Sequence, residues 1–431
     1  MCVPSSISST PANGRCCGEA GIGDAGLGIR KGRNDVNPSS SNPQFPIPNP
    51  EPRRFALCAG ETSGDQLGAG LIDALRMRFP DAQFAGIGGP GMRAAGMETW
   101  FDASALAVMG LAEVLAHLPR LLRLRKQFRQ RVLDWKPDVY IGIDAPDFNL
   151  GVERWLKQRG VRTVHDVSPS IWAWRKGRAA KIGQSADRVL CLFPMEPPIY
   201  ARHGVDARFI GHPLADAIPL QPDRSAARAA LGEETDTPIL ALLPGSRLGE
   251  IRRMLPDFAE AARRLAADIP GLRVLVPAAN AQCRAAIDTI LGDAASFRII
   301  DGQAQQSMIA SDCVLLASGT AALEAMLCKR PMVIGHRISA LTYRIVKLFG
   351  LLKSTHVSLP NVLAGEALVP ELLQDTCTPE NLHAALLHWF RDPQAVAALQ
   401  PRFLALHEQL RCDASQRAAE AVTELLVGKS S

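Results

Sequence analysis

Arg54-Phe-Ala-Leu-Cys-Ala-Gly60, followed by Glu61-Thr-Ser-Gly-Asp65, is the stretch of sequence that decides the fold. A short apolar run ends in glycine, a small polar loop follows, and apolar residues then recur at helical spacing from Leu67 to Arg78. These are the signals of a buried strand, a turn and an amphipathic helix. The folded part of the chain therefore opens with a unit of strand, loop and helix.

The same unit recurs in both halves of the chain. The further strands predicted from apolar runs are residues 83–87, 138–143, 162–167, 188–192, 238–243, 273–276, 313–317 and 331–335. Nearly continuous apolar strands that alternate with helices are typical of parallel sheets covered by helices on both faces. The predicted fold class is α/β, with two such sheets.

Changes in composition suggest where the domains begin and end. Residues 1–52 are rich in Ser, Pro, Asn and Gly, which predicts a disordered leader. We expect a first domain at 53–220, a second at 221–385 after a proline-rich linker, and C-terminal helices at 386–431 that pack back on the domains. Parallel sheets bind ligands beyond the carboxyl ends of their strands, which predicts a site in a cleft between the domains.

Composition narrows the class of protein. The 431 residues are 47% hydrophobic and 21% charged, enough for a large core. A net charge of only +5 and 5% aromatic residues argue against a nucleic acid partner. Ten cysteines without a CxxC pair indicate buried thiols of a cytoplasmic protein. No uncharged apolar run reaches the ~18 residues that span a bilayer, and no apolar secretory signal is seen in the first thirty.

In the first half, polar residues gather where the predicted strands end. Asp144 ends an apolar strand, where its carboxylate can accept a proton from an attacking hydroxyl group. The loop at 60–65 precedes a helix. Because Glu61 would repel a phosphate, we expect this loop to bind a sugar hydroxyl. The other candidates for the acceptor side are Ser63, Gly64, Asp65, Asn149, His165 and Arg175. His165 fits a cleft residue and a core histidine with a partner equally well.

In the second half, two loops have the composition of a diphosphate site. Gly245, Ser246 and Arg247 follow the strand at 238–243, and Ser318, Gly319 and Thr320 follow the strand at 313–317. Glycine allows close approach of the backbone, arginine offers a bidentate fork, and a helix N-terminus adds partial positive charge. Glu324, in the helix that follows, can accept hydrogen bonds from both hydroxyls of a ribose.

A glycine-rich segment, Gly86-Ile-Gly-Gly-Pro-Gly91, matches the GxGxxG pattern of dinucleotide sites. That pattern requires an acidic residue at the end of the next strand, about 20 residues on. Glu113 has that spacing but lies in an amphipathic helical pattern. We therefore interpret the segment as a turn, and a dehydrogenase that uses NAD would rest on this segment alone.

An amphipathic segment rich in cations spans residues 108–132, and residues 341–353 have the same character. A cationic amphipathic helix can lie in an anionic membrane surface, where each cation contributes about 1 kcal/mol. A helix that faces the core with a solvated basic side is the alternative. The residues predicted to contact a membrane are Leu111, Val114, Leu115, Leu118, Leu121, Leu122 and Arg123.

Six motifs then appear in order and carry a resemblance. They are Ala59-Gly-Glu-Thr-Ser-Gly-Asp65, Gly142-Ile-Asp-Ala-Pro-Asp-Phe-Asn149, Val167-Ser-Pro-Ser170 with Trp172-Ala-Trp-Arg175, Leu243-Pro-Gly-Ser-Arg247, Ala317-Ser-Gly-Thr-Ala-Ala-Leu-Glu324, and Ser358-Leu-Pro-Asn361 with Leu363-Ala-Gly365. The chain resembles the lipid-A-disaccharide synthases, glycosyltransferase family 19, from about Phe55 to about Leu425.

The resemblance implies a GT-B fold of two Rossmann-like domains and a reaction at the cytoplasmic face of the inner membrane. UDP-2,3-diacylglucosamine donates its sugar to the 6-hydroxyl of 2,3-diacylglucosamine 1-phosphate with inversion, which gives UDP and a β-1′,6 disaccharide. Asp144 matches the proposed general base of the family and Glu61 an acid near it. The residues expected on the UDP side are Gly245, Ser246, Arg247, Ser318, Gly319, Thr320, Glu324 and Asn361.

The chain departs from the family pattern at Asp166, where a tyrosine is usual. No pair of aspartates is spaced to hold Mg²⁺ on the diphosphate, so we expect a reaction without metal or cofactor. Another UDP-sugar enzyme of the GT-B class at the membrane, either a cell-wall N-acetylglucosaminyltransferase or an epimerase, is the nearest alternative. An inactive nucleotide-binding adaptor is a third, and a homodimer is left open.

Overall fold

The computed structural model describes residues 51–106, 111–169, 171, 178–292, 296–317, 319–337 and 356–427, and for 111–118 it describes the backbone alone. Contacts group the chain into two units, Met1–Glu51 and Pro52–Ser431. The fold described here is that of the second unit. Only Glu51 and Pro52 of the predicted leader are described, so its disorder stays a prediction.

The first sheet has seven strands in the order β3-β2-β1-β4-β5-β6-β7, and every neighbouring pair is parallel. Its strands are β1 (Arg54–Ala59), β2 (Gln83–Gly88), β3 (Glu98–Asp102), β4 (Val139–Ile143), β5 (Arg162–Asp166), β6 (Arg188–Cys191) and β7 (Ala207–Phe209). The order runs outward in both directions from β1 and β4. This is the switch point at which such sheets bind ligands.

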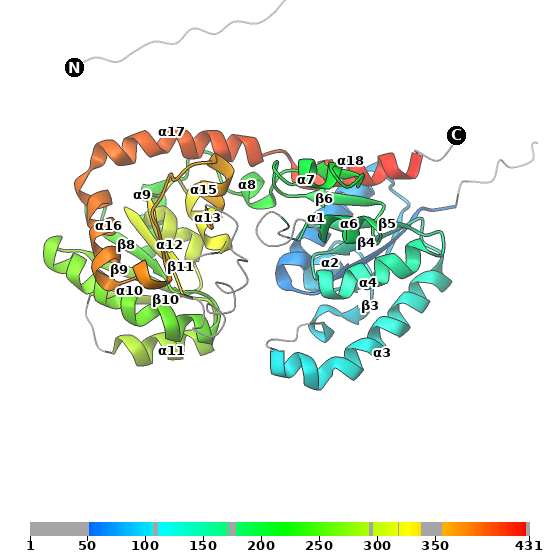
Figure 1. Cartoon of the computed structure of the whole chain (residues 1–431), viewed down its shortest axis with the longest axis horizontal. Coiled ribbons are helices and arrows are strands. Elements are labelled where there is room, and N and C mark those ends of the chain that lie inside the picture. The colour runs from blue at the N-terminus through cyan, green and yellow to red at the C-terminus, as the bar shows by residue number, and fades with distance from the viewer. Residues whose placement is uncertain are drawn as a thin grey trace, which may run out of the picture. The chain divides into compact units, whose positions relative to one another are not determined.

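Helices cover both faces of this sheet (Figure 1). They are α1 (Thr62–Arg78), α2 (Pro90–Ala94), α3 (Leu111–Trp135), α4 (Pro146–Lys157), α6 (Arg178–Gly183) and α7 (Pro197–Ala201). Leu57 and Ile141 share one core cluster with Leu71 of α1. Tyr140, the residue before Ile141, joins Phe128 of α3 in another cluster. Alternate residues of each strand thus pack against helices on opposite faces of the sheet, which explains why the strand sequences are almost continuously apolar.

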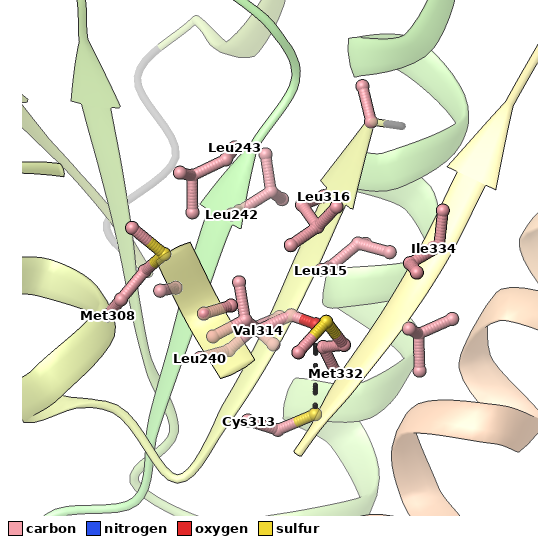
Figure 2. Close-up of a cluster of buried hydrophobic side chains, with 14 of the residues drawn as sticks. Leu240, Leu242, Leu243, Met308, Cys313, Val314, Leu315, Leu316, Met332 and Ile334 are labelled. Atoms are coloured by element: carbon pink, nitrogen blue, oxygen red, sulfur yellow. Dashed lines mark hydrogen bonds between the residues drawn. The ribbon is translucent and has the colours of Figure 1, made fainter. Parts of the chain in front are cut away.

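The second sheet repeats this plan with six parallel strands in the order β10-β9-β8-β11-β12-β13. The strands are β8 (Ile239–Leu243), β9 (Arg273–Ala278), β10 (Phe297–Asp301), β11 (Cys313–Ala317), β12 (Met332–His336) and β13 (Glu371–Leu373). Figure 2 shows the apolar side chains of β8, β11 and β12 packed together, with Met308 beside them. Its switch point lies between β8 and β11.

The helices of the second half end with two that contact different cores. The full set is α8 (Pro213–Ala217), α9 (Arg224–Leu231), α10 (Leu248–Asp268), α11 (Ala281–Leu291), α12 (Ala304–Ala310), α13 (Thr320–Leu327), α15 (Leu359–Ala364), α16 (Pro379–Arg391), α17 (Pro393–Leu410) and α18 (Ala414–Val427). Phe403 of α17 belongs to the core of the second sheet, whereas Val422 of α18 belongs to that of the first. The chain therefore returns to the first sheet at its C-terminal end.

The predicted α/β class with two parallel sheets is confirmed. The four strands that the sequence did not predict are β3, β7, β10 and β13, which form the edges of the two sheets. Among the described residues, no helix is long and apolar enough to cross a bilayer.

Candidate active site

The loop after β1 and the turn after β4 lie against each other at the switch point of the first sheet. A Cβ atom on Gly60 would lie 3.3 Å from that of Ala145, so the loop packs directly on the turn. Glu61 is the N-cap residue of α1, with an exposed side chain that makes no capping hydrogen bond. Ser63 is exposed and Gly64 is buried. Glu61 and Ser63 are thus available to a ligand beside Asp144.

Asp65, predicted to face the acceptor, is instead buried and fully engaged. Its carboxylate accepts hydrogen bonds from the backbone N–H groups of Gly89 (2.7 Å), Gly91 (2.7 Å) and Met92 (3.0 Å). It therefore fastens the glycine-rich turn to α1. In a dinucleotide site, N–H groups of this kind would bind the phosphates, so the turn has no free donors for NAD at these positions.

Asp144 follows the last residue of β4 in a left-handed turn. Its φ is 49° and that of Ala145 is 44°, a conformation that is uncommon outside glycine and tolerated best by Asp and Asn. The backbone N–H of Asp144 donates to the carbonyl of Asp166 at 2.8 Å. The half-buried side chain leaves the sheet at the switch point, where sequence analysis placed it.

The side chain of Asn149 holds this turn through hydrogen bonds. Its side-chain amide donates to the carbonyls of Asp144 (2.8 Å), Cys58 (3.2 Å) and Ile143 (3.3 Å). Its carbonyl accepts from the hydroxyl of Tyr140 at 2.9 Å. Because Asn149 is completely buried, it is a structural support of Asp144, and the prediction that it faces the acceptor is corrected.

His165, on β5, is also completely buried. Its Nδ1 lies 2.7 Å from Oε1 of Glu153, a residue of α4 that the sequence analysis did not select. Of the two alternatives left open, the structure supports a core histidine with a partner. Arg175, with Trp172 and Trp174, lies outside the described residues.

Asp166, the departure from the family pattern, is buried next to His165. Burial raises the pKa of its carboxyl to about 6, although the charge of His165 and the N–H of Val167 lower it. Val167 has a φ of 73°, a strained conformation for a β-branched residue. Backbone strain therefore lies directly beyond the end of β5, next to Asp144.

In the second sheet, the loop after β8 presents exposed side chains on a fixed backbone. Gly245 has a φ of 118°, and a Cβ atom there would lie 2.1 Å from Oε2 of Glu250. The positive φ, together with this close contact, favours glycine at this position. Ser246 and Arg247 are exposed, and Arg247 is the N-cap residue of the 21-residue helix α10. The loop thus combines a guanidinium with the N-terminal end of a long helix.

The turn after β11 is the partner of this loop at the second switch point. Gly319 has a φ of 148° and precedes α13, and both Gly319 and Thr320 are exposed. Glu324 is half-buried one turn further on, and burial raises the pKa of its carboxyl. Ser318 lies outside the described residues.

Asn361, predicted on the UDP side, is buried and makes four hydrogen bonds. Its side-chain amide donates to the carbonyl of Val369 and to Glu371, both at 2.9 Å, and its carbonyl accepts from the N–H groups of Leu368 (2.9 Å) and Val369 (3.0 Å). It fastens α15 to β13, so the prediction of direct contact with UDP is corrected to a structural role.

A second carboxyl group that the sequence analysis missed is Glu196, which is 1% exposed beyond the end of β6. Burial raises the pKa of Glu196 to about 8, although hydrogen bonds from Ser168, Phe193 and Leu192 lower it. The folded protein keeps a proton here that the unfolded chain loses near the ordinary value of 4.5. Stability contributed by this proton is therefore lost as the pH rises from about 4.5 to about 8.

We expect Glu196→Gln to stabilise the protein more at pH 8.5 than at pH 5, by an amount on the order of 3 kcal/mol. The amide cannot ionise, and its oxygen can still accept from Phe193. The difference in melting temperature between variant and wild type, measured across this range, checks the prediction. Glu420→Gln, at an exposed carboxylate, is the matched control, and a pH-independent difference for Glu196→Gln would contradict the account.

The helix predicted to contact a membrane extends over Leu111–Trp135. Leu111, Val114, Leu115 and Leu118 are among the residues whose side chains are not described. Leu122 is 46% exposed, Leu121 is half-buried and Arg123 is exposed. Further along, Arg129 stacks on Trp155 and Arg131 on Trp100, each at 4.7 Å from the ring centre. Toward the N-terminal end of the described side chains, Arg120, Arg123 and Lys126 are exposed.

Two parallel sheets, with polar loops at both switch points, define a GT-B class of glycosyltransferases and epimerases. A putative UDP-N-acetylglucosamine 2-epimerase of Listeria monocytogenes has a TM-score of 0.60 at 12% identity and covers 88% of this chain and 97% of its own. A UDP complex of S. aureus MnaA gives 0.59 at 15% identity, over 87% and 97%. The calicheamicin glycosyltransferase CalG4 gives 0.53 at 16%, over 88% and 100%.

Sequence similarity narrows the class to one family. The model of the lipid-A-disaccharide synthetase family matches residues 55–422. A lipid-A-disaccharide synthase of Xanthomonas campestris is 65% identical over 399 residues, 91% of each chain. That of Xylella fastidiosa is 62% identical over 377 residues, 86% of this chain and 98% of its own. The chain belongs to the lipid-A-disaccharide synthase family, the glycosyltransferases of lipid A biosynthesis.

Proposed function

We propose that this chain transfers the sugar of UDP-2,3-diacylglucosamine to the 6-hydroxyl of 2,3-diacylglucosamine 1-phosphate and releases UDP. Family membership supports the reaction. The positions of the candidate residues support separate roles for the two sheets. Glu61 and Asp144 lie at the switch point of the first sheet, and Arg247 and Thr320 lie at that of the second. Acid and base chemistry and diphosphate binding are thereby assigned to different sheets.

In the proposed mechanism, Asp144 takes the proton of the acceptor 6-hydroxyl as its oxygen attacks the anomeric carbon of the donor. The bond from that carbon to the diphosphate breaks on the opposite side, so the product is a β linkage. Asp144 is suited to this role because its turn is fixed by Asn149 and its side chain is only half-buried. Glu61, exposed beside it, accepts from a sugar hydroxyl.

The second sheet binds the leaving group. Arg247 donates two parallel N–H groups to phosphate oxygens, and the N-terminal ends of α10 and α13 add partial positive charge. Donors of this kind stabilise negative charge as it develops on the departing UDP. Glu324 accepts from the ribose hydroxyls. Within the described residues no group of three His, Cys, Asp or Glu side chains is placed to hold a metal, and independence from metal stays a prediction.

The identity of the product tests the proposal. Purified protein given both substrates should form a disaccharide 1-phosphate whose anomeric proton coupling in the NMR spectrum shows a β linkage. An epimerase would change the donor sugar without any acceptor, so recovery of an altered UDP-sugar in place of the disaccharide would overturn the proposal.

We also propose that the protein binds the cytoplasmic surface of the inner membrane through the N-terminal part of α3. Leu122 and the exposed cations Arg120, Arg123 and Lys126 support this location, because two acyl chains on each substrate keep both substrates in a bilayer. Cations near an anionic surface contribute about 1 kcal/mol each, an attraction that salt screens.

We expect the double variant R123E/K126E to bind anionic vesicles at least about tenfold more weakly than wild type at low salt. Co-sedimentation with vesicles of phosphatidylglycerol and phosphatidylethanolamine measures this. R411E/R417E carries the same charge change at two exposed arginines of the C-terminal segment and serves as the control. Equal weakening by both variants would show that only net charge matters and would contradict a site on α3.

A further inference from the structure

A buried ion pair without a role in the mechanism above lies behind the Asp144 turn. Glu153 of α4 and His165 of β5 are both 0% exposed, and their facing atoms lie 2.7 Å apart. The outer atoms, Oε2 of Glu153 and Nε2 of His165, are buried and have no hydrogen-bond partner among the described residues. Two titratable groups with unpartnered atoms are therefore completely enclosed between α4 and β5.

Such a pair is poorly explained as a source of stability. Desolvation of two charges can exceed their mutual attraction, and each unpartnered buried atom adds a further cost. The backbone is nevertheless shaped to contain it. Gly142 lies opposite His165 in the pairing of β4 with β5, and a Cβ atom there would lie 2.2 Å from Oε1 of Glu153. The strand that leads to Asp144 thus has a gap in which the carboxylate sits.

The pair is connected to the Asp144 turn from two sides. Glu153 follows Asn149 by one turn of α4, and Asn149 holds the carbonyl of Asp144 at 2.8 Å. His165 precedes Asp166, whose carbonyl accepts the N–H of Asp144 at 2.8 Å. Both neighbours of the pair along the chain therefore fix the backbone of the proposed base.

We propose that Glu153 and His165 are positioning residues for the transfer reaction, which hold the Asp144 turn and place a buried imidazolium behind its carboxylate. The inference rests on the proposed role of Asp144 as the base. Neither residue touches the substrate in this account, since both are completely enclosed.

Electrostatics agree with this geometry. Burial alone would lower the pKa of His165, but the charge and hydrogen bond of Glu153 outweigh it and raise the pKa, with smaller contributions from Asp166 and Asp144. The charge of Glu153 thus holds the proton of His165 within the enclosed layer.

The other titratable groups around the pair come from each packed element. They are Cys58 of β1, Tyr140 of β4, Lys157 of α4 and Asp166 of β5. Of these only Lys157 is a cation, and it acts on Glu153 from a position that is 30% exposed. His165 is therefore the buried cation on which the proposal depends.

The test is the pH dependence of kcat/KM for release of UDP, with Glu153→Gln as the first variant. The amide keeps a hydrogen bond to His165 but removes the charge that holds its proton. We expect the acidic limb of this profile to move to higher pH by about one unit, because the enclosed layer loses a positive charge. E153Q/H165Q, which replaces the ion pair with a neutral pair of amides, should move it in the same direction. UDP affinity should match wild type in both variants, because the second sheet is untouched.

Thr163→Val, two residues before His165 on β5, is the matched control, since it removes a buried hydroxyl from the same strand without any change in charge. It should lower the melting temperature and leave the midpoint of the limb in place. If both Gln variants lose thermal stability but keep the wild-type midpoint, the inference is overturned. The proposed function would still stand in that case, provided that Asp144→Asn is inactive. Full activity of Asp144→Asn would instead remove the proposed base itself.

Discussion

Asp144→Asn should lower kcat by about 10²- to 10⁴-fold and leave the affinity for UDP unchanged. The amide has the size of the carboxylate but cannot accept the proton of the attacking hydroxyl. Asparagine also tolerates the left-handed turn at φ 49°, and the contacts of Asn149 and Asp166 to residue 144 are made by its backbone. The variant should therefore fold normally, which makes it a sharper test than alanine.

The measurement is steady-state release of UDP, together with UDP binding by calorimetry. Asp147→Asn is the matched control, because its side chain is 99% exposed three residues further along the same segment. It should retain wild-type kcat. An Asp144→Asn variant with more than a tenth of wild-type kcat would contradict general base catalysis by this residue.

Arg247→Ala should lower kcat/KM by about 10²- to 10³-fold. Its exposed guanidinium stands at the N-terminal end of α10, where it can form two hydrogen bonds to the diphosphate in the ground state and in the transition state. The loss should therefore be divided between a weaker affinity for UDP and a lower kcat. Arg247→Lys should recover only part of it, since lysine supplies the charge without the fork.

Arg252→Ala, at another exposed arginine of α10, is the control for a simple change in net charge. It should behave as wild type. Equal effects of the two alanine variants would show that the second sheet attracts the donor through its overall charge and would remove the specific role of Arg247.

The central strands of both sheets could be predicted from sequence because they are buried on two faces. β1, β4, β8 and β11 are apolar almost without interruption, and each is followed by a loop with distinctive residues. The missed strands β3, β7, β10 and β13 are the edges of the sheets, and only one residue among them, Ile300, is buried. An edge strand lacks the apolar run that identifies a strand.

The candidate site was predicted in position but not always in orientation. A motif shows that a residue follows a strand, and on that basis Glu61, Asp144 and Arg247 were placed correctly at strand ends. It does not show whether a side chain points outward or beneath the loop, as Asp65 and Asn361 do. The direction of the side chain depends on which backbone N–H groups it can accept from. Those groups belong to other segments or to the following turn, and no local pattern reveals them.

The missed carboxylate Glu153 had a weak signal in the sequence. Glu153 lies between Val152 and Leu156 on the buried face of α4, and Gly142 interrupts the strand that packs on it. A charged residue on a buried helical face, opposite a glycine in a strand, indicates an enclosed pair. Its partner on β5 could not be identified before the register of β4 and β5 was known.

The most direct test of the division of labour between the two sheets is UDP release from UDP-2,3-diacylglucosamine, measured in EDTA with and without 2,3-diacylglucosamine 1-phosphate. Wild type and Asp144→Asn should be compared side by side. The account predicts release that requires the acceptor, persists in EDTA and is lost in the variant, while the variant still binds UDP. Release without acceptor, or equal release by both proteins, would contradict it.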